Sequence, residues 1–201
     1  MAAVLGLQLA LPAEVTAGPR WLVPAIEVAL LAPVFVTNPV RLTRDTTWLR
    51  RAAVALTGLL GAANAGHLAR LVAVVLSGDR TDPRVLVQAA LLIWVTNVAV
   101  TALAMWEMDR GGPFARDPRH GRGPGRPDLL FPQMGGIAGW DATAWRPTFT
   151  DYLFLGFTTA TAFSPTDVLP LSAKAKWMMT AAASLSLVTL AVVAARAVNV
   201  L

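Results

Sequence analysis

The sequence predicts an all-α integral membrane protein, with four transmembrane helices and one shorter re-entrant half-helix in its C-terminal half. The first observation is composition: 55% of the 201 residues are apolar and only 14% are charged, too apolar for an ordinary soluble domain. The second is a series of apolar runs close to the ~20 residues that cross a bilayer. The third is that most of the seven tryptophans lie near the ends of these runs, as in interfacial belts. We therefore expect one multi-pass domain over residues 1–201 in the cell membrane.

The N-terminal residues 1–20 are apolar and contain no lysine or arginine before Arg20. A cleaved secretory signal begins with basic residues, so we expect this segment to remain as an interfacial or packed N-terminal arm. The first span is short and contains two prolines and Glu27, whereas the third is the cleanest apolar run. The expected spans are residues 21–36, 52–76, 85–106 and 173–199, with a polar loop at 107–149.

The end of the third span carries charged side chains followed by two glycines. Glu107, Asp109 and Arg110 either cap and anchor this helix or order the loop that follows it. The sequence Gly111-Gly112-Pro113 is typical of a helix stop. We interpret it in that way and not as a phosphate-binding loop.

Residues 150–170 form the expected re-entrant half-helix and the break after it. Thr148 or Thr150 can cap the helix start, with Asp151 in the first turn. Over residues 152–163 the helix would be roughly 18 Å long at about 1.5 Å per residue, too short for the ~30 Å core of a bilayer.

The helix is expected to stop at Ser164-Pro165-Thr166-Asp167, and Pro170 adds a second interruption. Non-helical backbone at membrane depth is tolerated only against protein or a water-filled cavity. This stretch is therefore the first functional candidate.

The distribution of basic residues predicts the orientation. Loops 37–51 and 107–149 are separated by two spans, so they share a side of the membrane, and together they hold ten of the seventeen basic residues. The opposite side has Arg20, Arg80 and Arg84. The positive-inside rule then puts both loops in the cytoplasm and the N-terminus outside.

Several polar residues fall inside the expected spans. Glu27 and Arg70 would lie at similar depths on antiparallel neighbours, with His67 one turn from Arg70. They form either a structural ion pair or part of an ion or proton pathway. Asn64 and Asn97 fall near the middle of consecutive spans, where an interhelical amide hydrogen bond is the simpler interpretation and a ligand role is the other.

The last span has two faces of small or polar residues, which are suited either to lining a pore or to contacting another subunit. One face holds Thr180, Ser184, Ala191 and Ala195, and the other holds Ser186, Thr189 and Arg196.

Three sequence blocks carry a resemblance to a known family. They are WEMDRGGP at 106–113, LLFPQ at 129–133, and DYLFLGFTTATAFSPTDVLPLS at 151–172, followed by a helix that ends in AARAVNVL. These blocks resemble an uncharacterised family of bacterial multi-pass membrane proteins, and the similarity extends over most of the chain. The third block is the most specific part of it.

The third block is also similar, more distantly, to the pore helix, filter and inner helix of potassium channels. The resemblance implies that Thr158, Thr159 and Thr161 stand where that family has its filter-leading threonines. It also implies that Asp167 takes the place of the aspartate after the filter. The glycine-tyrosine-glycine core is missing, however, and residues 163–166, Phe-Ser-Pro-Thr, replace it. Because proline fixes its own φ and restricts the residue before it, we do not expect a potassium filter.

The sequence gives no support for an enzyme, a cofactor or a metal site. It contains no cysteine and only two histidines, and it lacks a G-x-S-x-G elbow, an H-E-x-x-H pair and a phosphate loop. The basic residues lie in loops beside apolar segments, which favours lipid headgroups over nucleic acid as their partners.

The sequence favours an oligomeric, channel-like pore-loop protein whose selectivity is open, with a cation as one option. The alternative is a non-conducting structural or accessory subunit of a larger membrane complex. The expected partners are the lipid bilayer and either further copies of the chain or other membrane subunits. The pore-loop candidates are Thr158, Thr159, Thr161, Ser164, Thr166 and Asp167. The intramembrane candidates are Glu27, Asn64, His67, Arg70 and Asn97.

Overall fold

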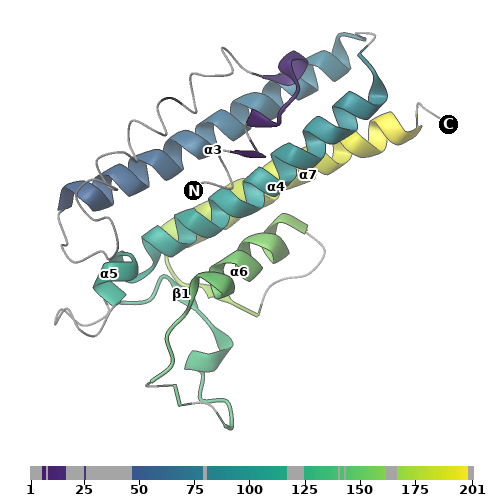
Figure 1. Ribbon diagram of the computed structural model, residues 1–201. Coiled ribbons are helices and arrows are strands. Elements are labelled where there is room, and N and C mark those ends of the chain that lie inside the picture. The colour runs from purple at the N-terminus through teal and green to yellow at the C-terminus, as the bar shows by residue number, and fades with distance from the viewer. Residues whose placement is uncertain are drawn as a thin grey trace.

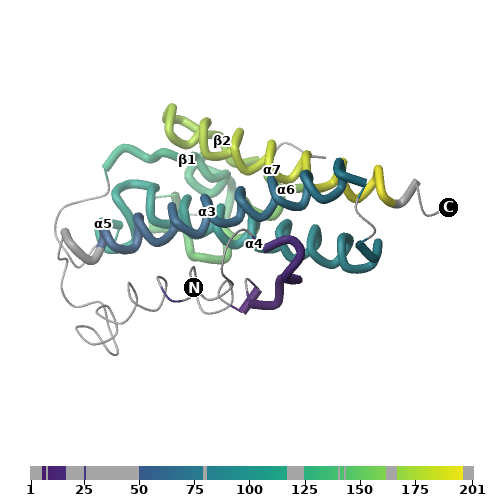
Figure 2. Tube along the Cα trace, turned by 90° about the horizontal axis from the view of Figure 1, so that it is seen from above, coloured from purple at the N-terminus to yellow at the C-terminus, as the bar shows by residue number. Residues whose placement is uncertain are grey.

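Three long helices dominate the structure. The computed structural model describes residues 6–7, 9–16, 25, 47–78, 81–116, 125–139, 141–142, 144–161 and 167–198, and it is mostly helical. The long helices are α3 (Thr47–Leu76), α4 (Pro83–Met108) and α7 (Ala173–Val198). They lie side by side with roughly parallel axes in two perpendicular views (Figure 1, Figure 2).

Each of these helices is long and apolar enough to cross a membrane, which supports a membrane location. The apolar segments are Arg50–Leu76, Pro83–Gly111 and Ala173–Arg196. Three of the expected apolar runs, 52–76, 85–106 and 173–199, are therefore confirmed as long helices. The expected first span, 21–36, lies outside the described residues except for Ala25, so the number of four spans stays a prediction.

Helix α4 is the centre of the bundle, because it packs against α3, α6 and α7 and is the most buried of the three long helices. Its start follows from local sequence. The carboxylate of Asp82 accepts a hydrogen bond from the backbone N–H of Arg84 at 2.8 Å, and Pro83 occupies the first turn. Both features are preferred at helix N-termini.

The end of α4 follows from its glycines. After a single 3-10 turn, η2 (Asp109–Gly111), the backbone of Gly111 and Gly112 has φ values of 85° and 97°. A Cβ atom on Gly112 would lie 3.2 Å from the carbonyl oxygen of Glu107, so glycine is required there for both space and conformation. The predicted helix stop is confirmed, and a short helix, α5 (Pro113–Arg116), follows it.

Part of the expected polar loop packs against this end of the bundle, because Leu129 and Phe131 are buried beside Met105, Tyr152 and Ala175. Residues 125–139 contain strand β1 (Leu129–Leu130) and the 3-10 turn η4 (Pro132–Met134). Strand β1 pairs antiparallel with β2 (Leu169–Pro170), with Leu129 opposite Pro170. We did not expect this short pairing from the sequence, because two residues per strand carry no detectable alternation.

The described part of the N-terminal arm packs against the opposite half of the bundle. Its 3-10 turn, η1 (Ala13–Val15), lies beside α3. Leu11 and Val15 are fully buried in one core cluster with Leu68 and Leu71 of α3 and Leu86 of α4. This agrees with the packed alternative for the arm.

A short helix, α6 (Phe149–Thr161, 13 residues), lies in the stretch where the half-helix is expected. Its re-entrant course stays a prediction, and residues 162–166 of the expected helix end and break lie outside the described residues. Its start is capped as expected: the N–H and hydroxyl of Thr148 both donate to Oδ2 of Asp151, at 2.6 and 2.8 Å. Thr148, rather than Thr150, therefore stands at the N-cap position. An acidic side chain at the third helical position that reaches back to the N-cap N–H forms one half of a capping box.

Helix α6 runs antiparallel to α4 along about half of its length. Tyr152 of α6 contacts Asp109 just beyond the end of α4, whereas the carbonyl of Ala160 accepts a hydrogen bond from Nε1 of Trp94, near the middle of α4, at 3.3 Å. The chain is then back at the end of α4 by residue 171, because the N–H of Leu171 donates to the carbonyl of Asp128 at 2.8 Å. The starts of α6 and α7 consequently lie at the same end of the bundle (Figure 1).

Candidate functional site

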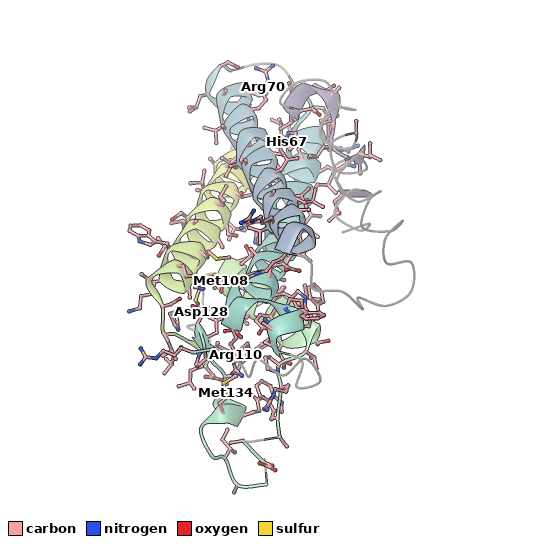
Figure 3. All side chains as sticks on the ribbon, turned by 90° about the vertical axis from the view of Figure 1, so that its left-hand side faces the viewer. His67, Arg70, Met108, Arg110, Asp128 and Met134 are labelled. Atoms are coloured by element: carbon pink, nitrogen blue, oxygen red, sulfur yellow. The ribbon has the colours of Figure 1, made fainter. Side chains whose placement is uncertain are left out.

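Residues in or within a few positions of the three sequence blocks at 106–113, 129–133 and 151–172 form one polar cluster at this end of the bundle. We call it the basal cluster, and it consists of Asp109, Arg116, Asp128, Tyr152 and Lys174. Side chains near its centre, including Met108, Arg110 and Asp128, gather at one end of the long helices, and His67 and Arg70 lie toward the other end (Figure 3). The sequence stretches concerned are up to 65 residues apart, from 109 to 174.

Asp109 is fully buried in the basal cluster, with 0% of its surface exposed. Its Oδ2 accepts a hydrogen bond of 2.6 Å from the hydroxyl of Tyr152, and its Oδ1 accepts one of 2.9 Å from the N–H of Asp128. The carboxylate thereby connects the end of α4 to α6 and to the segment before β1. Of the two roles left open for Asp109, ordering the following loop is the one observed.

Asp128 connects the same point to the start of α7. Its Oδ2 lies 2.9 Å from Nζ of Lys174 and accepts a hydrogen bond of 3.3 Å from the N–H of Arg110. Burial by itself raises the pKa of Asp128, but hydrogen bonds from Lys174 and Ser172, the charge of Lys174 and the N–H of Arg110 lower it below its usual value. Asp128 is therefore ionised, and its carboxylate links α4 to α7 through the N–H of Arg110 and the ammonium of Lys174. We call this link the latch.

Arg116 closes the cluster on its aromatic side. Its guanidinium lies 4.5 Å from the ring centroid of Trp106 and 5.1 Å from that of Tyr152, within the range of cation–π attraction. Its Nη1 donates to the carbonyl oxygens of Trp106 at 2.8 Å and Asp109 at 2.6 Å. The carbonyl of Asp109 also accepts a hydrogen bond of 3.0 Å from the N–H of Gly112. Carbonyls at a helix C-terminus carry partial negative charge, so a cation is well suited to bind them.

The environment of Tyr152 keeps its hydroxyl protonated. The side chain is 0% exposed and packs edge-on against Trp106 and Phe131. Burial and the hydrogen bond to Asp109 both raise the pKa of Tyr152 above its usual value, and they outweigh the nearby arginines. The phenol is therefore a stable hydrogen-bond donor. In chemical terms the basal cluster positions backbone segments, since Asp109 and Arg116 bind backbone groups and Asp128 pairs with Lys174.

The pore-loop candidates do not form a single group. The hydroxyl of Thr158 donates to the carbonyls of Phe154 and Leu155, and that of Thr161 donates to the carbonyl of Thr158 at 2.9 Å. Thr159 faces inward and is buried. Asp167 is exposed and adjoins Val168, which packs beside the basal cluster. Ser164 and Thr166 lie outside the described residues.

The intramembrane candidates also separate from one another. Asn64 donates to the carbonyl of Ile93 at 3.2 Å, and Asn97 donates to α7, so each amide makes an interhelical bond but not with the other. His67 is buried and hydrogen-bonds with the backbone of Val15. Arg70 is exposed. Glu27 lies outside the described residues, so its pairing with Arg70 stays a prediction.

The sequence analysis missed most of the basal cluster. The sequence pattern indicates Asp109 only as a helix cap or an anchor for the following loop, and it singles out none of the other members, which are Arg116, Asp128, Tyr152 and Lys174. The available signal was the set of three resembling blocks, since each contributes a side chain to this cluster or packs against it. Among the described residues there is no group of three or more histidines and carboxylates that could hold a metal ion.

Comparisons with protein-family models, with curated proteins and with solved structures found no match. The function is therefore inferred from the geometry of this chain.

Proposed function

We propose that the chain is a subunit of an oligomeric, channel-like membrane protein in which α6 is a re-entrant half-helix. One observation carries this proposal. Helix α6 starts beside Asp109, its last turn reaches Trp94 near the middle of α4, and the chain is back at its starting end by Leu171. If α4 crosses the membrane, α6 ends near mid-depth and returns to the surface from which it entered.

The tip of α6, which we define as residues 158–161, has the electrostatic character that a cation pathway requires. A helix C-terminus carries a partial negative charge from its free carbonyl groups, and its attraction for cations is stronger at low dielectric. The hydroxyls of Thr158 and Thr161 are already donated to carbonyls of the same helix. Backbone carbonyls and the hydroxyl lone pairs are therefore the proposed cation-attracting groups, as in other pore loops.

The basic residues support a cytoplasmic base for this half-helix. The guanidinium of Arg50 at the start of α3 lies about 3.9 Å from the Cβ position of Gly112, and Lys174 at the start of α7 pairs with Asp128. Basic side chains from both expected cytoplasmic loops and from α7 thus gather at one end. The positive-inside rule assigns that end to the cytoplasm and favours the four-span topology with the N-terminus outside.

A non-conducting structural or accessory subunit is the second candidate, and the outer face of α6 favours it. That face is apolar: Leu153, Phe154 and Phe157 are 40%, 62% and 47% exposed. An apolar face on a short helix is suited to packing against lipid or another membrane subunit. In this case the half-helix serves as an attachment surface and no ion passes its tip.

Reconstitution separates these two functions. We expect the purified protein to be an oligomer by detergent-corrected mass measurement, and to pass monovalent cations in proteoliposomes. Asp167→Asn should lower that flux several-fold because it removes a carboxylate at the proposed mouth. Glu14→Gln, which removes an exposed carboxylate of the N-terminal arm, is the matched control and should leave the flux unchanged.

A strictly monomeric protein could not form a pore between subunits, and this result would contradict the proposed channel. A stable oligomer that passes no cation would identify the accessory role instead.

A further inference from the structure

A second polar region lies in the interior of the three long helices, about half-way along them. It is formed by side chains that are all at least nine-tenths buried, and we call it the polar layer. Its members are Asn64 of α3 (1% exposed), Thr96 and Asn97 of α4 (0% and 5%), and Ser186 and Thr189 of α7 (0% and 2%). It lies within one chain, so it does not depend on the pore-loop proposal.

The hydrogen bonds on the α7 side of the polar layer are made within the protein. Nδ2 of Asn97 donates to the carbonyl of Ala182 at 2.9 Å and to Oγ of Ser186 at 2.8 Å. Oγ1 of Thr189 donates to the carbonyl of Leu185 at 2.7 Å. Both hydrogens of the Asn97 amide and the hydroxyl hydrogen of Thr189 are therefore used.

The α3 side of the layer is different. Nδ2 of Asn64 donates to the carbonyl of Ile93 at 3.2 Å, but Oδ1 of Asn64 has no hydrogen-bond partner in the described part of the chain. Oγ1 of Thr96 also has none. Native proteins rarely leave such buried polar atoms unsatisfied.

Oδ1 of Asn64 and Oγ1 of Thr96 lie at a similar height along the bundle axis. An α-helical carbonyl points along the axis toward the residues three and four positions later, so an amide bonded to the carbonyl of Ile93 lies at the level of Thr96 and Asn97. Oδ1 of an amide can only accept a hydrogen bond, whereas a hydroxyl can donate or accept. A single group that donates to Oδ1 of Asn64 and exchanges a hydrogen bond with Oγ1 of Thr96 would satisfy both atoms.

We propose that Asn64 and Thr96 hold an internal water molecule that bridges α3 and α4 at the centre of the bundle. Water fits the chemistry because it donates to the amide oxygen and exchanges a hydrogen bond with the hydroxyl. A monovalent cation fits less well. All five members of the layer are neutral, and a buried charge without a counter-charge is costly.

Thr96→Val tests the bridge, because the proposal predicts a lower melting temperature and the absence of a bridge predicts a higher one. Valine keeps the shape of threonine and removes only the hydroxyl. If water bridges the two residues, the variant leaves the water and Asn64 Oδ1 without a partner, and the melting temperature should fall by about 2–4 °C. If Thr96 has no partner at all, removing a buried unpaired hydroxyl should raise the melting temperature, and this result would overturn the proposal.

Thr57→Val is the matched control, because Thr57 is buried on α3 but its hydroxyl donates to the carbonyl of Ala53 in the same helix. Asn64→Leu combined with Thr57→Val should give additive losses. Asn64→Leu combined with Thr96→Val should lose less than the sum, since both single changes remove the same bridge. Additivity in the second pair would contradict the bridge.

Radiolytic hydroxyl-radical labelling of the unchanged protein gives an answer even if these variants do not fold. Radicals formed from bound water should modify side chains around Ile93 and Thr96, although both residues are buried. Because Leu91 in the same stretch is exposed, the label must be located residue by residue. Unmodified Ile93 and Thr96 would count against the proposal. The melting temperature should also be the same in sodium, potassium and choline chloride. A rise in sodium chloride alone would indicate that the site binds a sodium ion and would contradict the proposed water.

Discussion

The two ends of α6 differ in how they are held. At its base, Tyr152 donates to a fully buried Asp109, which also binds the N–H of Asp128, and Arg116 lies against Trp106 and Tyr152. At its tip, one hydrogen bond of 3.3 Å joins Ala160 to Trp94, and Phe157 packs edge-on against the Trp94 ring. The base is fixed by a network of hydrogen bonds. Among the described residues the tip makes one side-chain hydrogen bond with α4, and it otherwise packs through the buried Thr159 and Ala160.

One short helix can therefore have a fixed position at its base and fewer stabilising hydrogen bonds at its tip. Networks of buried hydrogen bonds specify one arrangement because each missing partner is costly. The base therefore sets the position and direction of α6. The tip carries few such bonds, so its sequence can be changed with little effect on folding. A functional role at the tip and a structural role at the base are the expected division.

The greatest loss is expected from Gly156→Ala, half-way between the two ends. A Cβ atom at Gly156 would lie 2.8 Å from the carbonyl oxygen of Val98 and 3.2 Å from the N–H nitrogen of Ala102. Both contacts are with α4 backbone, which cannot move aside easily, and overpacking of this kind costs about 1–3 kcal/mol or more. Thermal unfolding in detergent and the yield of folded protein measure the effect.

Gly58→Ala is the control for that variant, because no atom lies within 4 Å of its Cβ position. Alanine should stabilise α3 there by up to about 1 kcal/mol through its higher helix propensity. If Gly156→Ala behaves like Gly58→Ala, α6 does not pack closely on α4 and the comparison between its two ends fails.

Tyr152→Phe should have the next largest effect. It removes one of the two donors to the buried carboxylate of Asp109, and a hydrogen bond to a charged group contributes about 1.5–3 kcal/mol. Thr158→Val removes a hydroxyl at the tip that bonds only within its own helix, and should change the free energy of unfolding by no more than about 0.5 kcal/mol. Equal losses in the two variants would show that the base is no better anchored than the tip.

The smallest effect is expected from the Asp128–Lys174 pair, and it depends on pH. Lys174 is 55% exposed, so the pair contributes about 0–1 kcal/mol. The folded-state pKa of Asp128 lies below its usual value of 3.8, so the stabilisation is present above pH 3.8 and is lost as the pH falls through the folded-state pKa. Melting temperatures measured from pH 7 down to pH 3 should therefore decline in acid.

Asp128→Asn should make that acid decline shallower, and Asp167→Asn, which removes an exposed carboxylate outside the basal cluster, should leave it unchanged. An unaltered acid decline in Asp128→Asn would exclude Asp128 as the latch between α4 and α7.

The long helices could be predicted because apolar runs, the Gly111-Gly112 stop and the Thr148 cap each act over a few residues. Their starts are predicted less well, since α3 begins at Thr47 and α4 at Pro83, ahead of the expected residues 52 and 85. The start of α6 could be predicted for the same local reason, whereas most of its expected break lies outside the described residues. The packing of α6 on α4 could not be predicted, since Gly156 contacts residues more than fifty positions earlier.

The basal cluster and the partners of the polar residues could not be predicted from spacing. Asn64 and Asn97 were paired on the basis of depth, but the rotation of each helix directs Asn64 to the backbone of Ile93 and Asn97 to α7. Asp128 lies in a segment without hydrophobic periodicity, and its role depends on the fold-back that brings it beside Asp109 and Lys174. Rotation and fold-back are properties of the assembled bundle.

The central claim is that α6 enters and leaves the membrane on one side, and single-cysteine labelling tests it most directly. The chain has no cysteine, so Thr148→Cys, Ala173→Cys and Ser77→Cys each introduce one reactive thiol, at the starts of α6 and α7 and at the link between α3 and α4. With a membrane-impermeant maleimide, we expect Thr148→Cys and Ala173→Cys to react from the cytoplasmic side and Ser77→Cys from the opposite side. Reaction of Thr148→Cys and Ala173→Cys from opposite sides would make 149–172 a crossing and would contradict the claim.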